Sequence, residues 1–366
     1  MSKFRYPLVG LAALALLAGA SLLIPAPSSA QNGSQYRASN NNYGVSGGNI
    51  NDISRQFCCS GTLGSLIQDS TGVQYILSNN HVLGLADRAQ AGDDVSQPGR
   101  IDANCQVTEI VADFTVAPSL TTGVDAAIAQ LRPGAMNSTG AIEGIGTISS
   151  VVRAPAVGLG VQKSGRTTGH TTGSVSSVST TVSIRYPKSC GASGGTARTF
   201  TNQVVINSST FSAGGDSGSL IVTNDANRQP VALLFAGSST STIGNPIGVV
   251  LSRVGAALGR SVSFVGGSAA AAQSLGFSVT PEGTFMPELP EIAADAAARV
   301  LSDNVDELMS RPGVIGVGVG PGSQDKSEAV IVLYLNPAER TEAKGLPKVI
   351  DGVRVRRVYT DEFVAR

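Results

Sequence analysis

Short apolar runs separated by turn residues fill the middle of the chain. From Cys58 to about Val265, stretches rich in Gly, Ser, Thr, Asn and Asp separate the runs GTLGSLI, QYILS, QVTEIVADFTV, DAAIAQL, GTISSVV, GSVSSVSTTVSIRY, QVVINS, GSLIV and PVALLFAG. Runs of this length that are rich in Val, Ile and Thr are typical of strands. Many short strands between closely spaced turns predict a β-sandwich or a β-barrel.

Two later segments have the periodicity of a helix instead. Apolar residues three or four positions apart predict a helix that closes the β-rich part, at Ile247, Val250, Leu251, Val254 and Leu258. A second, amphipathic helix is predicted to end near Arg311 and Pro312, with Leu289, Ile292, Ala296, Val300, Val305 and Leu308 on one face. The runs GVIGVGVG, EAVIVLYL and GVRVRRVY then predict three strands. We therefore expect a linker over 266–288 and a small α+β module over 289–366.

The beginning of the chain has the pattern of a secretory signal. Two basic residues precede an apolar run over 8–24, and Ser28 and Ala30 supply the small side chains that a signal peptidase requires. We predict a signal peptide over 1–30, cleaved after Ala30, and a protein that is secreted (extracellular or periplasmic) without stable membrane insertion. The alternative is an uncleaved membrane anchor, because the apolar run approaches the length of a membrane span. Residues 31–54, rich in Asn, Gly and Ser, predict a loose polar arm or a short pro-segment.

The composition agrees with an extended, turn-rich chain. The 366 residues include 44 Gly and no Trp, and only 14% of them are charged. The formal net charge of the chain is +0 at pH 7. This balance gives no sign of a nucleic-acid partner, which a clustered basic surface would indicate.

Four cysteines, Cys58, Cys59, Cys105 and Cys190, predict disulfide bonds in an exported protein. The neighbours Cys58 and Cys59 rarely have the geometry to bridge each other, which leaves two cross-pairings open. A metal site is the rival interpretation, but the sequence has no CxxC pair and only 2 His residues. We expect no metal and no cofactor.

The stretch GGDSGS, residues 214–219, raises the question of a nucleophilic serine. A serine hydroxyl is a poor nucleophile near neutral pH unless a base lies within hydrogen-bond reach and a carboxylate orients that base. His81 directly follows the apolar run QYILS, where a loop can project the imidazole into a cleft. His170 lies among turn residues in GRTTGHTTG, which favours a structural role. The sequence therefore predicts Ser217 as nucleophile and His81 as base.

The best candidate for the carboxylate is Asp125, which opens the apolar run DAAIAQL. An unpaired charge at a buried strand end is costly, and an imidazole partner would stabilise it. The alternative is that Asp125 only caps a strand, with Asp102 and Asp113 as rival acids. The glycines of GGDSGS allow a sharp turn in which the amides of Gly215 and Ser217 converge as an oxyanion hole.

Taken together, the motifs SNNHVL, VDAAIA and GGDSGS resemble the histidine, aspartate and serine motifs of the trypsin-like (chymotrypsin-fold) serine proteases. The stretch KSGRTTG is similar to that of small secreted bacterial members such as alpha-lytic protease and the streptogrisins, and LLFAGSS and NPIG extend the similarity over about 55–260. The resemblance implies a mainly β fold, a chymotrypsin-like double β-barrel of two six-stranded barrels, in a protease domain over 55–265. The α+β module over 289–366 lies outside it.

The resemblance also implies an activity and a substrate. The protein is expected to be a monomeric serine endopeptidase that cleaves protein or peptide substrates through an acyl-enzyme intermediate. Substrate-binding residues are implied as well, with Phe235, Ala236 and Gly237 along one wall of the primary pocket and Phe211 at its base. An aromatic base with no charge nearby predicts a preference for small or apolar side chains.

The chain departs from the animal members of this family in two ways. Val82 follows His81 where many of those members have a cysteine, and no activation sequence of the animal type is present. A new N-terminus therefore does not neutralise Asp216, the acid before the nucleophile. The resemblance to the bacterial members implies that Lys163 pairs with Asp216, with Arg166 as second choice.

Two other functions stay open at this point. One is a catalytically silent protein that keeps the fold as a binding module, and the other is an ester or other acyl hydrolase. The order His, Asp, Ser and the absence of GxSxG at Ser217 argue against an α/β-hydrolase esterase. The module over 289–366 shows no chemistry of its own, and we expect a structural, substrate-delivering, inhibitory or folding role.

Overall fold

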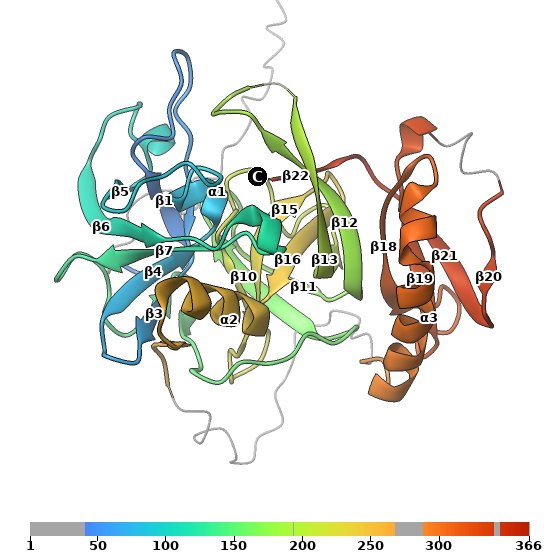
Figure 1. Ribbon diagram of the computed structural model, residues 1–366. Helices are drawn as coiled ribbons and strands as arrows, with labels where there is room; N and C mark the ends of the chain where they lie inside the picture. Colours follow the sequence, from blue (N-terminus) through green and yellow to red (C-terminus); the bar gives the residue numbers. More distant parts are fainter. Residues whose placement is uncertain (1–40, 193, 268–287, 340–344, 366) are drawn as a thin grey trace, which may run out of the picture. The chain divides into compact units, whose positions relative to one another are not determined.

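The computed structural model describes residues 41–192, 194–267, 288–339 and 345–365. The predicted signal peptide and most of the predicted linker lie outside these residues. The described chain is mainly β, with its strands in two large sheets (Figure 1). The mainly β fold class that the sequence predicts is confirmed.

The first sheet is antiparallel throughout and carries α1 (Asn80–Leu83) at the end of one strand. Its spatial order is β17 (Val262–Phe264), β3 (Ser65–Asp69), β4 (Gln74–Ser78), β7 (Ala127–Leu131), β6 (Glu109–Val116), β5 (Asp94–Gln97), β1 (Val45–Asn49) and β2 (Gly61–Leu63). The buried side chains of these strands form one hydrophobic core with Val250 and Val254 of α2 (Ile247–Leu258). The predicted helix that closes this part is therefore confirmed.

The second sheet begins at one edge with the hairpin of the KSGRTTG stretch. Its spatial order is β11 (Gly169–Ser174), β10 (Gly160–Gly165), β14 (Leu220–Thr223), β15 (Pro230–Gly237), β16 (Ser241–Pro246), β13 (Gly195–Asn207), β12 (Ser177–Pro187), β18 (Val314–Pro321), β19 (Ala329–Leu335), β21 (Val353–Tyr359) and β20 (Val349–Ile350). A further strand, β22 (Phe363–Ala365), pairs with both β12 and β15. The strands β15, β16, β13, β12 and β22 therefore close into a ring.

The remaining elements are short or lie outside the two sheets. The hairpin β8 (Ala141–Ile142) and β9 (Gly146–Thr147) forms a separate two-stranded sheet. Three 3₁₀ turns are η2 (Arg100–Asp102), η3 (Leu120–Thr122) and η5 (Pro337–Glu339). The helix predicted after the linker is confirmed as α3 (Glu291–Ser310). Its predicted apolar face is wrong in part, because the helix buries Ala297 and Leu301 beside Leu308 while Ile292 is 85% exposed. None of the described helices combines the length and the apolar composition that a membrane crossing requires.

The sheets are larger than the two six-stranded barrels that the resemblance implies. Within the described residues the first sheet has eight strands and the second has twelve. The first gains β1 and β17, which lie at or beyond the ends of the expected domain, and the second continues from β12 into β18. Of the predicted strand GTISSVV, only Gly146–Thr147 forms a strand, and Ser149 adds a single bridge to Gly267. Val151 and Val152 are exposed, so the run has no continuous buried face.

The expectation of a loose polar arm is wrong for its second half. Tyr43 and Val45 are fully buried, and β1 pairs with β2 on one side and with β5 on the other. Glycine makes this burial possible, since a Cβ on Gly47 would lie only 2.4 Å from the Leu63 side chain. Low apolar content therefore hid a strand that is paired on both sides and has a tightly packed backbone.

The three strands predicted in the α+β module form as β18, β19 and β21. Helix α3 covers β18 and β19, with Leu301 and Leu308 in a hydrophobic cluster of their own. The module is not separate from the β-rich part, because β18 pairs with β12 and the Tyr334 hydroxyl lies 2.8 Å from Ser177 Oγ. Its strands therefore continue the second sheet.

Candidate active site

Strand pairing brings His81 and Asp125 together. His81 lies on α1 directly after β4, and Asp125 lies directly before β7, the antiparallel neighbour of β4. The His81 Nδ1 atom is 2.6 Å from Asp125 Oδ2, and the His81 backbone N–H donates to Asp125 Oδ1 at 3.1 Å. These two contacts fix both the ring orientation and the backbone around it, which leaves Nε2 as the nitrogen that faces away from Asp125.

Asp125 is fully buried and makes further hydrogen bonds with residues that the sequence did not single out. The Tyr186 hydroxyl donates to Asp125 Oδ2 at 2.7 Å. Asn79 Nδ2 donates to the Asp125 carbonyl at 2.7 Å, and the Asp125 N–H donates to Asn245 Oδ1 at 2.9 Å. Burial, with the nearby Asp125 charge as a second cause, raises the pKa of Tyr186 well above its ordinary value. Tyr186 is therefore a fixed neutral donor that holds this carboxylate.

We expect Tyr186→Phe to lower kcat/KM for a peptide substrate by about tenfold, since a hydrogen bond to a charged group contributes about 1.5–3 kcal/mol. Without this donor the Asp125 carboxylate is held less firmly and orients the His81 ring less well. A matched control is Tyr75→Phe, because the Tyr75 hydroxyl makes the same kind of hydrogen bond elsewhere in the fold. It donates to the buried carboxylate of Asp69 at 3.1 Å. Equal kcat/KM values in the two variants would contradict the role of Tyr186.

Ser217 lies in a glycine turn just before β14 of the second sheet. The turn needs glycine at two positions, since Gly215 has φ +97° and Gly218 has φ +96°. A Cβ on Gly218 would also lie 2.2 Å from Ser78 Oγ and from the Thr62 carbonyl of the first sheet. The Ser217 carbonyl accepts a hydrogen bond from the Thr62 N–H at 2.8 Å, so this turn is docked directly on the first sheet.

The hydroxyl of Ser217 donates to the backbone carbonyl of Phe235 at 3.1 Å. The whole residue is fully buried. To act as a nucleophile with His81 as base, the hydroxyl must turn from this carbonyl toward the imidazole, and a substrate must be able to reach it.

The acid before the serine is held by Lys163. The fully buried Lys163 Nζ is 3.3 Å from Asp216 Oδ2 and donates to the Gly169 carbonyl at 3.0 Å. Asp216 Oδ1 accepts from the N–H groups of Thr167 and Thr168 at 2.8 and 3.1 Å. Burial lowers the pKa of Lys163, and the Asp216 charge opposes that effect.

Arg166, the second choice for this pairing, lies elsewhere. Its guanidinium makes a bidentate ion pair with Asp102 at 2.6 and 2.7 Å. The other rival acid, Asp113, pairs with Arg132 at 2.6 Å. His170 contacts Gln162 Oε1 at 2.8 Å through Nε2. The structure thus places the rival acids and the rival histidine away from the pair of His81 and Asp125.

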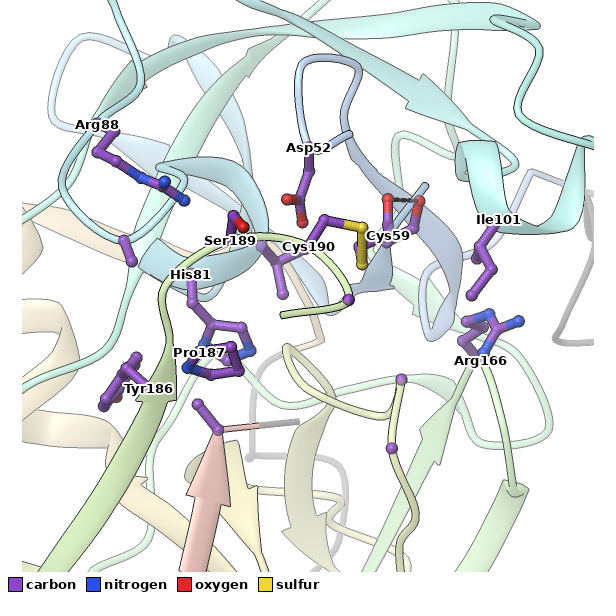
Figure 2. Close-up of a pocket in the computed structure, with 17 residues that line it drawn as sticks. Asp52, Cys59, His81, Arg88, Ile101, Arg166, Tyr186, Pro187, Ser189 and Cys190 are labelled. Atoms are coloured by element: carbon purple, nitrogen blue, oxygen red, sulfur yellow. Dashed lines mark hydrogen bonds between the residues drawn. A yellow bond between two sulfur atoms is a disulfide. The ribbon is translucent and has the colours of Figure 1, made fainter. Parts of the chain in front are cut away.

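A cavity of about 270 Å³ lies between the two sheets (Figure 2). His81 and Tyr186 line it on one side, Gly214 and Gly215 line it near the serine turn, and Ala365 of β22 contributes as well. Of the predicted substrate-binding residues, Phe211, Phe235 and Ala236 are fully buried in hydrophobic clusters, and Gly237 pairs with Val364. They are not among the residues that line this cavity.

Two disulfides settle the pairing that the sequence left open. Cys58 bonds Cys105, and Cys59 bonds Cys190. The second bond lines the cavity and ties the loop after β12 to the first sheet (Figure 2). A carboxylate oxygen of Asp52 lies within 4.8 Å of both sulfurs of this bond, but disulfide sulfurs are not thiolate ligands. Two disulfides are typical of a protein that folds outside the cytoplasm.

Comparison with known proteins gives likenesses among solved structures only. No family model and no curated protein matches the sequence. A glutamic acid-specific serine protease is 21% identical with a TM-score of 0.41, covering 61% of this chain and 98% of that chain. A chymotrypsin of Cellulomonas bogoriensis is 17% identical with a TM-score of 0.41 (62% and 99%), and protease A of Thermobifida fusca is 20% identical with a TM-score of 0.38 (57% and 92%). Likenesses at this level carry no residue's role, substrate or activity over to this chain.

Proposed function

We propose that the protein is a secreted serine endopeptidase, extracellular or periplasmic, that cleaves peptide bonds with Ser217, His81 and Asp125. The observation that carries the proposal is the pair of half-buried His81 and fully buried Asp125, in which His81 lines the same cavity as Gly215 of the serine turn. Buried Asp125 selects the tautomer in which Nδ1 carries the proton. In that tautomer Nε2 carries no proton, so it is the nitrogen that would accept the proton of an attacking serine.

In the proposed reaction, Ser217 Oγ attacks the substrate carbonyl carbon while His81 takes the hydroxyl proton. The negative charge that forms on the carbonyl oxygen is stabilised by the N–H groups of Gly215 and Ser217. His81 then protonates the leaving amine, and the acyl-enzyme forms. Water, activated by the same imidazole, releases the acid product and restores Ser217.

We further propose that Phe211, Phe235, Ala236 and Gly237 shape the primary substrate pocket, with a preference for small or apolar side chains. Phe211 and Phe235 are fully buried and uncharged, which supports an apolar pocket rather than one that selects Lys or Arg. Digestion of a peptide library, followed by mass spectrometry of the fragments, measures this preference.

The proposed nucleophile is tested by labelling the purified protein without residues 1–30 with a fluorophosphonate probe. We expect covalent labelling at Ser217, complete loss of labelling in Ser217→Ala, and retained labelling in Ser209→Ala, which changes an exposed serine. Casein digestion in the labelled preparation then separates an endopeptidase from an ester hydrolase. If the folded protein is never labelled at Ser217, even after removal of residues 361–366, the endopeptidase function is excluded. The result would then favour a binding module without catalytic activity.

A further inference from the structure

The strand β22 occupies a slot between two strands of the second sheet. It runs parallel to β12 and antiparallel to β15, with the register Ile184↔Phe363, Arg185↔Val364, Gly237↔Val364 and Ala236↔Ala365. The two flanking strands come from the part of the chain that carries Ser217, whereas β22 follows the whole α+β module. An extended segment that follows the end of β15 by about 120 residues in sequence therefore adds to this sheet.

The slot leads to the proposed nucleophile. Along β15, the residue before Ala236 is Phe235, whose carbonyl accepts the Ser217 hydroxyl. Val364 lies opposite Gly237 and Ala365 lies opposite Ala236. The next position along a peptide in this slot therefore lies opposite Phe235. A peptide in this slot thus runs from its amino toward its carboxyl side as it approaches Ser217. This is the direction that the acyl part of a substrate must have, because its last carbonyl is the one attacked.

The segment also reaches the cavity itself. Ala365 lines the cavity together with His81 and Tyr186, and the arrowhead of β22, faint red in Figure 2, points to the side where Tyr186 and Pro187 lie. Ser217 is fully buried in this arrangement. An acyl-side peptide cannot pair with β15 at Ala236 and Gly237 while Val364 and Ala365 occupy those positions.

Side-chain contacts anchor the segment from its beginning. Phe363 is fully buried in a hydrophobic cluster and stacks edge-on against Tyr334 at 5.8 Å between ring centroids. Arg185 of β12 donates to both carboxylate oxygens of Glu362, at 2.5 and 2.7 Å. The Ser239 N–H, two residues after Gly237, donates to Asp361 Oδ1 at 2.9 Å. These are the contacts of a bound peptide: an aromatic anchor, an ion pair and a paired backbone.

We propose that residues 361–365 are an intramolecular peptide ligand that fills the acyl-side substrate groove between β12 and β15 and thereby inhibits the enzyme. This inference rests on the proposed function. It assigns the groove a ligand class, an extended peptide with an aromatic side chain at the position of Phe363, a β-branched one at Val364 and a small one at Ala365. A tethered segment has an effective concentration of about millimolar, so even modest affinity keeps the groove occupied.

The first experiment compares the full chain without residues 1–30 with a variant that also lacks residues 361–366. A segment that fills the groove about nine-tenths of the time lowers the apparent rate about tenfold. We therefore expect the shortened protein to be labelled by the fluorophosphonate probe, and to cleave casein, at least about tenfold faster. Circular dichroism and thermal unfolding establish that it is folded.

A second set of variants keeps the chain length and tests the segment through its ion pair. Glu362→Arg places like charges together at Arg185 and should speed labelling, and Arg185→Glu combined with Glu362→Arg should slow it again. Glu328→Arg is the matched control, because Glu328 forms an ion pair with Arg354 on the far side of the α+β module. A purely structural strand would change the unfolding temperature in these variants without changing the labelling rate.

The third experiment supplies the segment in trans. The peptide DEFVAR should inhibit the shortened protein competitively, and a peptide with Ala in place of Phe should be much weaker. Labelling of the shortened protein at the same rate as the full chain, with no inhibition by DEFVAR, would overturn the inference and leave the proposed function standing. No Ser217-dependent labelling in either protein would instead overturn the proposed function.

Discussion

Replacing Asp125 by Asn is expected to lower kcat for peptide hydrolysis by about 10⁴-fold. The carboxylate accepts from His81 Nδ1 at 2.6 Å and thereby keeps the proton on that nitrogen. An amide of the same shape can instead donate its N–H to Nδ1, which places the imidazole proton on Nε2, where it can no longer receive the proton of Ser217. The loss should be in kcat, because Asp125 is fully buried and contacts no substrate.

The control for this prediction is Asp113→Asn. Asp113 is the rival acid that pairs with Arg132 on the surface of the first sheet. The comparison uses steady-state hydrolysis and probe labelling in the same background, preferably the form without residues 361–366, so that occupancy of the groove does not mask the chemistry. An Asp125→Asn protein with native unfolding temperature and native rate would contradict the assignment of Asp125.

The second large effect is expected at Lys163, where Lys163→Ala should reduce the free energy of unfolding by about 3 kcal/mol. Removing one partner of a buried ion pair generally costs about 3–5 kcal/mol, because it leaves a buried charge uncompensated. The lower end of that range applies, since Asp216 keeps hydrogen bonds from Ala213, Thr167 and Thr168. Probe labelling of Ser217 should fall together with stability, because the hydrogen bonds of Asp216 hold the turn that carries Ser217.

Urea denaturation and labelling test this prediction together. Lys326→Ala, which removes an exposed lysine, should leave both unchanged. Combining Lys163→Met with Asp216→Asn removes both charges and should regain part of the stability, since no lone charge is left buried. A Lys163→Ala protein with native stability and native labelling would show that the remaining hydrogen bonds suffice for Asp216.

Much of the site could be predicted because its residues stand next to strands that are clear in the sequence. His81 and Asp125 flank the apolar runs that become β4 and β7, and these neighbours in the sheet bring the two side chains together. The glycine content of GGDSGS likewise signals the turn around Ser217, in which two glycines have positive φ. Local pattern is sufficient where each functional residue lies at the end of a strongly apolar strand.

Tyr186 shows what the pattern does not reveal. It lies on β12 of the second sheet and donates to Asp125 of the first, so the contact depends on how the two sheets pack. The sequence likewise does not predict strand β22, because its three residues FVA are too few to show a periodicity and both of its partner strands are distant in sequence. Lys163 and Arg166 stand three residues apart, and only the fold separates them: Lys163 points into the buried side of β10, and Arg166 follows the strand and reaches Asp102.

The continuity between β12 and β18 has a practical consequence for anyone who shortens this protein. A piece that stops at residue 265 would strip β12 of both β18 and β22 and expose a long row of unpaired N–H and C=O groups. Beside that row, Val182 and Phe200 would lose the cover that Tyr334 and Phe363 provide. Such an open apolar edge is a template for pairing between copies of the chain. We therefore expect the piece that stops at residue 265 to aggregate when it is produced without the residues that follow it.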